Sequence, residues 1–161
     1  MAADLFSYLW LELTLNSIFE LRVCRVAEAG AHYRSRKITS TSEARCFCTD
    51  TLCQYFAERS HREEFGLVTL DTKHRATGIF TVTTGTLDAS LVHPREVFRP
   101  AVYNGASSVL LFHNHPSGDP TPSREDFHVT RRLKEAGKLI GIDVLDHIII
   151  ADGEALSIAE A

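Results

Sequence analysis

The chain of 161 residues lacks an excess of positive charge. Lysine and arginine together number 17, against 21 aspartates and glutamates, which gives a formal net charge of −4 at neutral pH. Proteins that hold nucleic acid nonspecifically depend on a basic surface, because much of their affinity comes from neutralising phosphates. The overall charge therefore does not support nucleic-acid binding, although it leaves room for a local basic patch.

The sequence also lacks a long uncharged hydrophobic run. The apolar stretch 1–19 is interrupted by Asp4 and Glu12 and falls short of the roughly 20 residues that span a bilayer. A secretory signal peptide would contain positive charge early, yet the first basic residue is Arg22. We therefore expect a cytoplasmic protein that does not enter a membrane.

Cysteine is scarce, and the spacing of the four residues does not favour a structural metal site. Cys46, Cys48 and Cys53 fall in a segment with a helical pattern, where side chains two positions apart point about 200° away from each other. Such side chains cannot easily share one ion. We expect reduced thiols, as is usual in a cytosolic protein.

Hydrophobic periodicity predicts an α/β protein in which strands and helices alternate in a mixed order. This pattern is typical of a central mixed β-sheet flanked by helices. The helices are expected over 40–59, 93–104 and 123–141, with Gly137 as an alternative end of the third, and Pro100 should bend or shorten the second. Strands are expected over 65–70, 76–84, 107–112, 147–150 and 155–158.

The N-terminal part of the chain shows no catalytic pattern. Apolar residues between 5 and 28 recur at loosely helical spacing, and a short basic connector follows at 34–37. We expect residues 1–37 to form a helical appendage that serves packing or oligomerisation. The sequence thus leaves a homo-oligomer open.

Two histidines mark the candidate site. The apolar run Val109–Phe112 is long enough for the end of a buried strand and is followed by His113 and His115. Because side chains alternate along a strand, the two imidazoles should leave on the same side. After a loop rich in proline and glycine, a helix begins with Asp126 in its first turn. Two imidazoles and one carboxylate suit a zinc ion with an open fourth position.

The carboxylate of this set has a simpler interpretation as well. Ser123 and Asp126 have the spacing of a helix-capping pair, in which the carboxylate is favoured by the helix dipole. Both interpretations can hold, because one oxygen can bind zinc while the other accepts a backbone N–H. Asp119 is the rival ligand, but it lies in the loop, whereas the helix sets the direction of Asp126.

The other six histidines need no catalytic function. Two of them are expected in the core or beside the site, each hydrogen-bonded to backbone: His93 and His147. The remaining four fall in polar surroundings and are expected in solvent: His32, His61, His74 and His128.

These motifs resemble a known family. His113-Asn-His-Pro followed by Ser123-x-x-Asp resembles the JAMM (MPN+) metalloprotease motif, and residues 90–98, 113–123 and 145–149 resemble the bacterial RadC family more closely. The resemblance covers residues 38–161. It implies a cytidine-deaminase-like α/β fold, one zinc ion per chain, and a water activated by an upstream glutamate.

Carried over position by position, the resemblance implies a role for each site residue. His113, His115 and Asp126 match the zinc ligands. Ser123 matches the hydroxyl that helps to stabilise the oxyanion. Glu63, two residues before a phenylalanine, matches the general base; Glu64 is the alternative, although alternation places it on the other face of the strand.

The resemblance implies a zinc-dependent hydrolase that cleaves peptide or isopeptide bonds in a peptide or protein substrate. One alternative is a DNA-repair accessory protein, although residues 1–40 show no glycine-punctuated helix-hairpin-helix region. Another is a noncatalytic scaffold, although such relatives usually lack the metal ligands that this chain keeps. A base deaminase is disfavoured, because the Pro-Cys-x-x-Cys part of its His-x-Glu and Pro-Cys-x-x-Cys signature is absent.

Overall fold

A computed structural model describes residues 36–161 of the chain, except 54–55, 57–60 and 86–91. Its centre is a five-stranded sheet in the order β2-β1-β3-β4-β5, in which only β3 and β4 run parallel. The predicted α/β class with a mixed central sheet is confirmed. The helix predicted within 5–28 lies outside the described residues. The strands are β1 (Glu64–Leu70), β2 (Ala76–Thr84), β3 (Ser108–Asn114), β4 (Asp143–Ala151) and β5 (Glu154–Ser157).

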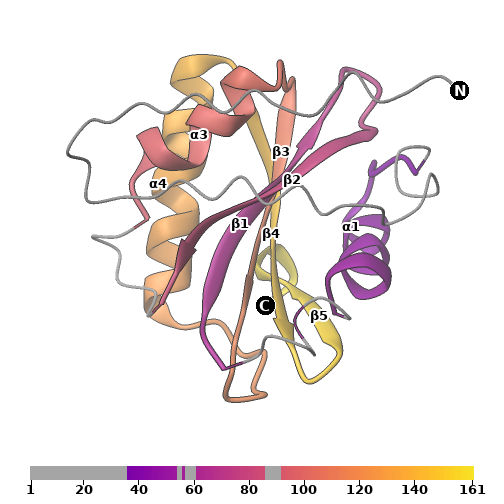
Figure 1. The fold of residues 1–161 in the computed structure, drawn as a ribbon, viewed down its shortest axis with the longest axis vertical. Helices are drawn as coiled ribbons and strands as arrows, with labels where there is room; N and C mark the ends of the chain where they lie inside the picture. The colour runs from indigo at the N-terminus through magenta and orange to yellow at the C-terminus, as the bar shows by residue number, and fades with distance from the viewer. Residues whose placement is uncertain (1–35, 54–55, 57–60, 86–91) are drawn as a thin grey trace, which may run out of the picture.

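Helices cover both faces of the sheet (Figure 1). α1 (Thr41–Cys48) packs on one face, and α3 (Pro94–Tyr103) and α4 (Arg124–Ile140) pack on the other. Every residue of the central strands β1 and β3 is buried, because each strand contributes alternate side chains to two separate cores. The strand ends that bear the candidate site are therefore held rigidly from both sides.

The first helix changes its hydrogen bonding partway along. Ser40 caps it as expected, since its hydroxyl accepts the Glu43 N–H, but the α-helix ends at Cys48 and continues as a π-helical turn, η2 (Thr49–Cys53). Thr49, Asp50 and Thr51 are weak helix formers, which explains why regular α-helical bonding stops here. Of the remaining predicted helix, Phe56 is helical, and 54–55 and 57–60 lie outside the described residues.

The second helix is not shortened by its internal proline. α3 runs through Pro100 and stops at Asn104, where the Asn-Gly pair predicted an end. Proline removes one backbone donor, so only the bond to the carbonyl of Glu96, near the start of the helix, is lost. α4 begins after Ser123 and ends at Gly141, whose φ of 74° is the left-handed conformation that glycine adopts most easily.

The parallel crossover from β3 through α4 to β4 positions the candidate site. β3 ends at Asn114, its loop leads to the first turn of α4, and the antiparallel neighbour β1 begins at the same end of the sheet, where Phe65 pairs with His113. β4 begins at Asp143 rather than at the predicted residue 147, because its pairing with β3 extends back to Ser108. Three elements thus meet where the histidines emerge.

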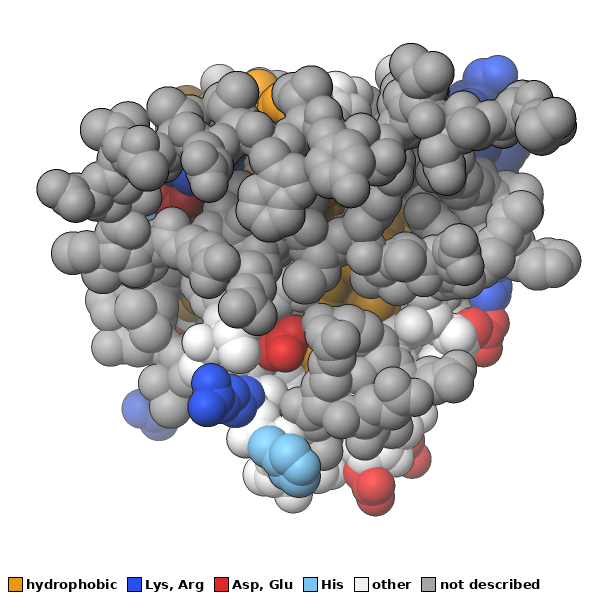
Figure 2. Space-filling view, viewed as in Figure 1, with side chains coloured by type: hydrophobic (Ala, Val, Ile, Leu, Met, Phe, Trp, Pro, Cys, Tyr) orange, Lys and Arg blue, Asp and Glu red, His pale blue; other side chains and the backbone are white. Residues whose placement is uncertain are grey.

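Charges of both signs are interspersed where the described residues reach the face shown in Figure 2. No helix among the described residues combines the length and the apolar character needed to cross a bilayer. Within the same part of the chain, the three cysteines are unpaired thiols, and burial raises the pKa of Cys48.

Candidate metal centre

The structure brings the two predicted histidines together on one side of β3. The Nε2 atoms of His113 and His115 lie 2.9 Å apart, and their rings are tilted by 59°. His113 is fully buried, whereas the side chain of His115 is 15% exposed. The two Nε2 atoms, which would bind a cation, therefore face the same point. Solvent reaches that point from the side of His115.

Asp126 completes this group from the first turn of α4. Its Oδ1 lies 3.3 Å from Nε2 of His113, and its Oδ2 lies 3.6 Å from Nε2 of His115. Oδ2 also accepts hydrogen bonds from the backbone N–H of Ser123, at 2.7 Å, and from the Ser123 hydroxyl, at 2.6 Å. The carboxylate thus caps the helix and faces both histidines at once, so both interpretations of the Ser-x-x-Asp spacing apply.

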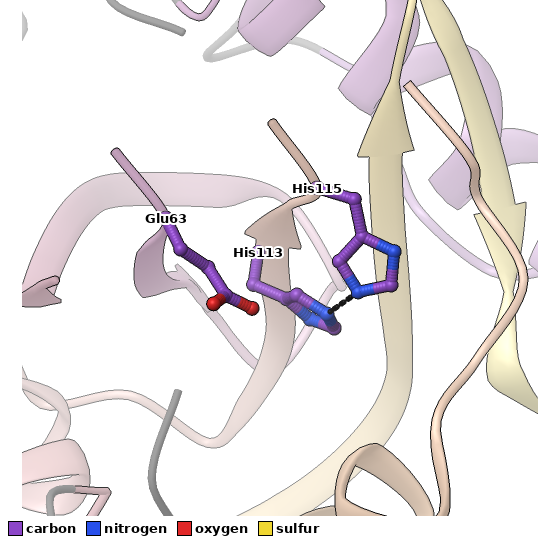
Figure 3. A group of neighbouring side chains, drawn as sticks. All are labelled: Glu63, His113 and His115. Carbon is purple, nitrogen blue, oxygen red and sulfur yellow. Dashed lines mark hydrogen bonds between the residues drawn. The ribbon is translucent and has the colours of Figure 1, made fainter. Parts of the chain in front are cut away.

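Glu63 approaches the histidines from the residue just before β1. Its carboxylate and the ring nitrogens of His113 and His115 lie within 4.8 Å of one another, and Figure 3 shows the carboxylate pointing toward His113. Glu64, the alternative, begins the strand and is buried, but it does not belong to this group. Side chains alternate along the strand, which separates the two neighbouring glutamates.

Asn114, between the two histidines, holds the backbone on both sides of Glu63. Its side-chain oxygen accepts the N–H of Glu64 at 2.7 Å, and its amide nitrogen donates to the carbonyl of Arg62 at 3.1 Å. The carbonyl of Glu63 itself accepts the N–H of Gly85 at 2.8 Å. Asn114 is buried, so these bonds are shielded from water and fix the place where Glu63 leaves the backbone.

The two histidines have pKa values shifted in opposite directions. Burial lowers the pKa of His113 to about 3, so the ring is neutral at pH 7. The carboxylate of Asp126, with Oδ2 3.6 Å from Nε2, raises the pKa of His115 because it stabilises the protonated ring. Burial alone would raise the pKa of Asp126, but the nearby rings of His115 and His113 and the bonds from Ser123 outweigh it and lower that pKa.

Each histidine has a partner on its far nitrogen. Nδ1 of His115 lies 2.7 Å from the backbone carbonyl oxygen of Asp119, which can only accept. Nδ1 of His113 lies 2.8 Å from Nε2 of His147, a ring with no exposed surface. The carboxylate of Asp119, the rival ligand, accepts the N–H of Thr121 instead. Asp119 thus reaches His115 through its backbone.

His147 does not hydrogen-bond to backbone as predicted. Its ring bonds to two side chains, at Nε2 to His113 and at Nδ1 to Thr130 of α4, 2.6 Å away. The strand alternation of β4 turns the ring toward α4, where these side chains are its neighbours. His93 does accept a backbone N–H, from Arg95, but it lies at the surface as the cap of α3.

Sequence reasoning missed two residues that shape this site, Asn114 and Thr130, and it placed His147 in the core or beside the site without its contact to His113. Asn114 stands inside the motif but between the two histidines, where alternation sends its side chain to the opposite face. Thr130 lies one helical turn after Asp126, and that spacing was the available signal for a residue beside the site. His147 had no local signal, since it reaches His113 only through the pairing of β3 with β4.

The donor set fits a bound metal ion. Nε2 of His113, Nε2 of His115 and the carboxylate of Asp126 converge, with 2.9–3.6 Å between the histidine nitrogens and their neighbours. All three groups can donate an electron pair to a cation. Nδ1 of His115 donates its proton to a carbonyl, so Nε2 of the neutral ring is left as a lone pair. A hydrogen-bond partner on the far nitrogen is the usual support of a metal-binding histidine.

Comparison with known proteins identifies relatives of this chain. The model of the family described as RadC-like JAB domain matches residues 38–161. A UPF0758 protein of Caldanaerobacter subterraneus subsp. tengcongensis is 56% identical over 99 residues, which cover 62% of this chain and 42% of the relative. A UPF0758 protein of Methanosarcina mazei is 44% identical over 146 residues, which cover 91% of this chain and 61% of the relative. The chain therefore spans about half the length of the curated relatives it matches.

Proposed function

The chain belongs to the RadC-like JAB domain family, and from this premise we propose that it is a zinc-dependent hydrolase of peptide or isopeptide bonds. One observation supports the proposal above all: the side chains of His113, His115 and Asp126 converge, with the carboxylate of Glu63 beside them. The relatives are longer than this chain, so the proposal concerns the matched domain and its peptide or protein substrate.

The three converging side chains are the proposed ligands. Two imidazoles and one carboxylate are a common ligand set of catalytic zinc, which keeps a further position open. Nitrogen and oxygen ligands without thiolate also distinguish this set from a structural cysteine site. The partly exposed His115 marks the side from which water and substrate would enter.

Zinc, when bound, would lower the pKa of a coordinated water from about 15.7 to about 7 and so supply a nucleophile at neutral pH. Glu63 would accept a proton from the attacking water as the water oxygen bonds to the carbonyl carbon of the substrate. The same carboxyl would then donate that proton to the amine nitrogen as the C–N bond breaks. Asn114 would keep Glu63 in reach during both transfers, because it fixes the flanking backbone.

Ser123 has a proposed role in stabilising the oxyanion. Its hydroxyl now donates to Oδ2 of Asp126 at 2.6 Å, so in the reaction it would turn to donate to the substrate oxygen. The backbone N–H of Ser123 also bonds to that carboxylate oxygen and would hold it while the hydroxyl turns. A donor placed where charge develops lowers the barrier more than one that binds the ground state.

The exchange of Glu63 for glutamine tests the proposal. Glu63→Gln removes the proton acceptor and keeps the size of the side chain, so we expect zinc to stay bound while hydrolysis falls by about 10²–10⁴-fold. Zinc content is measured by elemental analysis, and hydrolysis by mass spectrometry of digests of a peptide library and of isopeptide-linked peptides.

Glu64→Gln is the matched control, because it makes the same change one residue further along on the other face of β1. It should leave both zinc content and hydrolysis unchanged. An active Glu63→Gln protein would remove that residue from the mechanism, and loss of activity in Glu64→Gln alone would assign the role to Glu64. A wild-type protein that holds zinc and cleaves nothing would favour a scaffold.

A further inference from the structure

We infer that Thr130 and His147 form a hydrogen-bonded relay that fixes the tautomer of His113, so that Nε2 of His113 presents a lone pair to the metal centre. The inference rests on the proposed function only in taking His113 as a metal ligand. The relay itself is a property of the metal-free chain. Thr130 comes from α4 and His147 from β4, outside the stretch from His113 to Asp126.

The relay links three side chains and one backbone carbonyl through short contacts. The Thr130 hydroxyl lies 2.6 Å from the carbonyl oxygen of Asp126 and 2.6 Å from Nδ1 of His147. Nε2 of His147 lies 2.8 Å from Nδ1 of His113. All these residues are buried, so water does not compete for the bonds.

The direction of proton donation along the relay is set by the carbonyl group of Asp126 at its end. A carbonyl oxygen can only accept, so the Thr130 hydroxyl must give its one proton to Asp126. The oxygen of Thr130 must then accept from His147, which places a proton on Nδ1 of that ring. In a neutral His147, Nε2 is consequently an acceptor, and it takes the Nδ1–H of His113.

The surroundings of His147 favour the neutral ring on which this direction depends. The side chain is fully buried, and its ring packs against that of Phe65 in a T-shaped arrangement, with the ring centroids 5.4 Å apart. The hydrogen-bond partners of the ring are a hydroxyl and an imidazole, and neither is a carboxylate that would stabilise a charged ring. A proton on both nitrogens would also force two donors against each other between His147 and His113.

The relay prepares His113 for a cation. With the proton on Nδ1, Nε2 of His113 carries the lone pair and is the acceptor of the hydrogen bond that joins it to Nε2 of His115, 2.9 Å away. The opposite tautomer would put a hydrogen on Nε2 and would have to be reversed before a metal could bind. Thr130 and His147 are therefore positioning residues whose effect on the metal passes through His113.

Nitrogen NMR of the metal-free 161-residue chain tests the relay directly. Long-range proton–nitrogen correlation spectra distinguish a protonated ring nitrogen from a bare one. We expect the wild-type protein to show the proton of His113 on Nδ1. Thr130→Val removes the hydroxyl at similar size, so His147 should turn to its other tautomer and the proton of His113 should move to Nε2. Thr130→Ser keeps the hydroxyl and should keep the wild-type pattern.

Zinc affinity provides the second measurement, by competition with a chromophoric chelator. Thr130→Val should weaken zinc binding by about tenfold to hundredfold, the usual effect of removing such a partner, and Thr130→Ser should restore it. Thr69→Val is the matched control. It makes the same exchange at another buried threonine, whose hydroxyl lies 2.9 Å from that of Thr77 near the opposite end of β1, and it should leave zinc affinity and tautomer unchanged.

The outcomes separate this inference from the proposed function. A proton on Nε2 of His113 in the wild-type protein would overturn the relay, even if zinc binds and peptides are cleaved. Unchanged tautomer and affinity in Thr130→Val would overturn it as well. A wild-type Nδ1 proton without any hydrolysis would support the relay and reject the hydrolase. If Thr130→Val does not fold, the position of the His113 proton in the wild-type spectrum still tests the relay.

Discussion

The site has two halves that are supported by different means. The strand half contains Glu63 and His113, whose positions depend on buried side chains from β3, β4 and α4. The loop half contains His115 and Asp126, whose side chains are held by backbone and capping bonds between residues no more than four positions apart. The side chains of one half are thus fixed by the assembled fold and those of the other by their own short segment, while the backbone N–H of His115 also bonds to the carbonyl of Ile150 in β4.

This difference explains the opposite character of the two histidines. His113 loses all contact with water, and this burial outweighs the nearby carboxylate of Asp126, so its pKa is lowered. His115 keeps some exposure and lies against a carboxylate, so its pKa is raised. His113 would therefore be a rigid, buried ligand for a cation, and His115 would be a ligand that the cation can reach from solvent.

The largest expected effect separates the two histidines by stability. His113→Ala should lower the free energy of unfolding of the metal-free protein by about 2–4 kcal/mol, because it leaves a buried cavity and an unpaired His147. His115→Ala should cost less than about 1 kcal/mol, since the ring is partly exposed. Urea unfolding followed by circular dichroism measures both, and equal losses would break the comparison.

A smaller effect concerns catalysis in the strand half. Asn114→Ala should reduce peptide turnover by about tenfold to hundredfold while zinc content stays the same, because Glu63 loses the anchors of its flanking backbone. Turnover is measured with a substrate identified for the wild-type enzyme. Asn104→Ala is the matched control: its amide also joins elements of the fold, donating to Thr69 and Thr77, but away from the site. Unchanged turnover in Asn114→Ala would contradict the positioning role.

The smallest effect is a difference in pH dependence between the halves. The folded-state pKa of His113, about 3, lies below the unfolded value, so between pH 6.5 and about 3 the unfolded chain binds a proton that the folded domain does not. Its contribution to stability is therefore lost as the pH falls through that window. For His115 the folded pKa is raised above 6.5, so its contribution is present at low pH and is lost as the pH rises through the folded value.

Urea unfolding of the metal-free protein across pH 3–9 measures these contributions. His113→Gln should flatten the loss of stability on the acid side, and His115→Gln should flatten the decline above pH 6.5. Each variant is compared with the wild type at every pH, so the titration of other carboxylates cancels. The same slope change in both variants would show that the two halves do not differ electrostatically.

Much of the fold was predictable because its signals are local. Alternation and apolar runs located β1, β2 and β3, and the capping residues Ser40 and Ser123 located two helix starts. The predictions missed the π-helical turn after Cys48 and placed the start of β4 too late, because that start depends on pairing with β3.

The sequence by itself determined the meeting of His113, His115 and Asp126, because strand alternation and a helix cap direct side chains over short distances. It also separated Glu63 from Glu64 by the same alternation. Only the tertiary structure decided which distant residues hydrogen-bond to these side chains and to the backbone that carries them. His147 lies 34 positions from His113, and Arg62 lies 52 positions from Asn114, so their hydrogen bonds exist only once the strands have paired and α4 has packed. Local geometry selects which groups face the site, and long-range burial sets the protonation and rigidity that its chemistry needs.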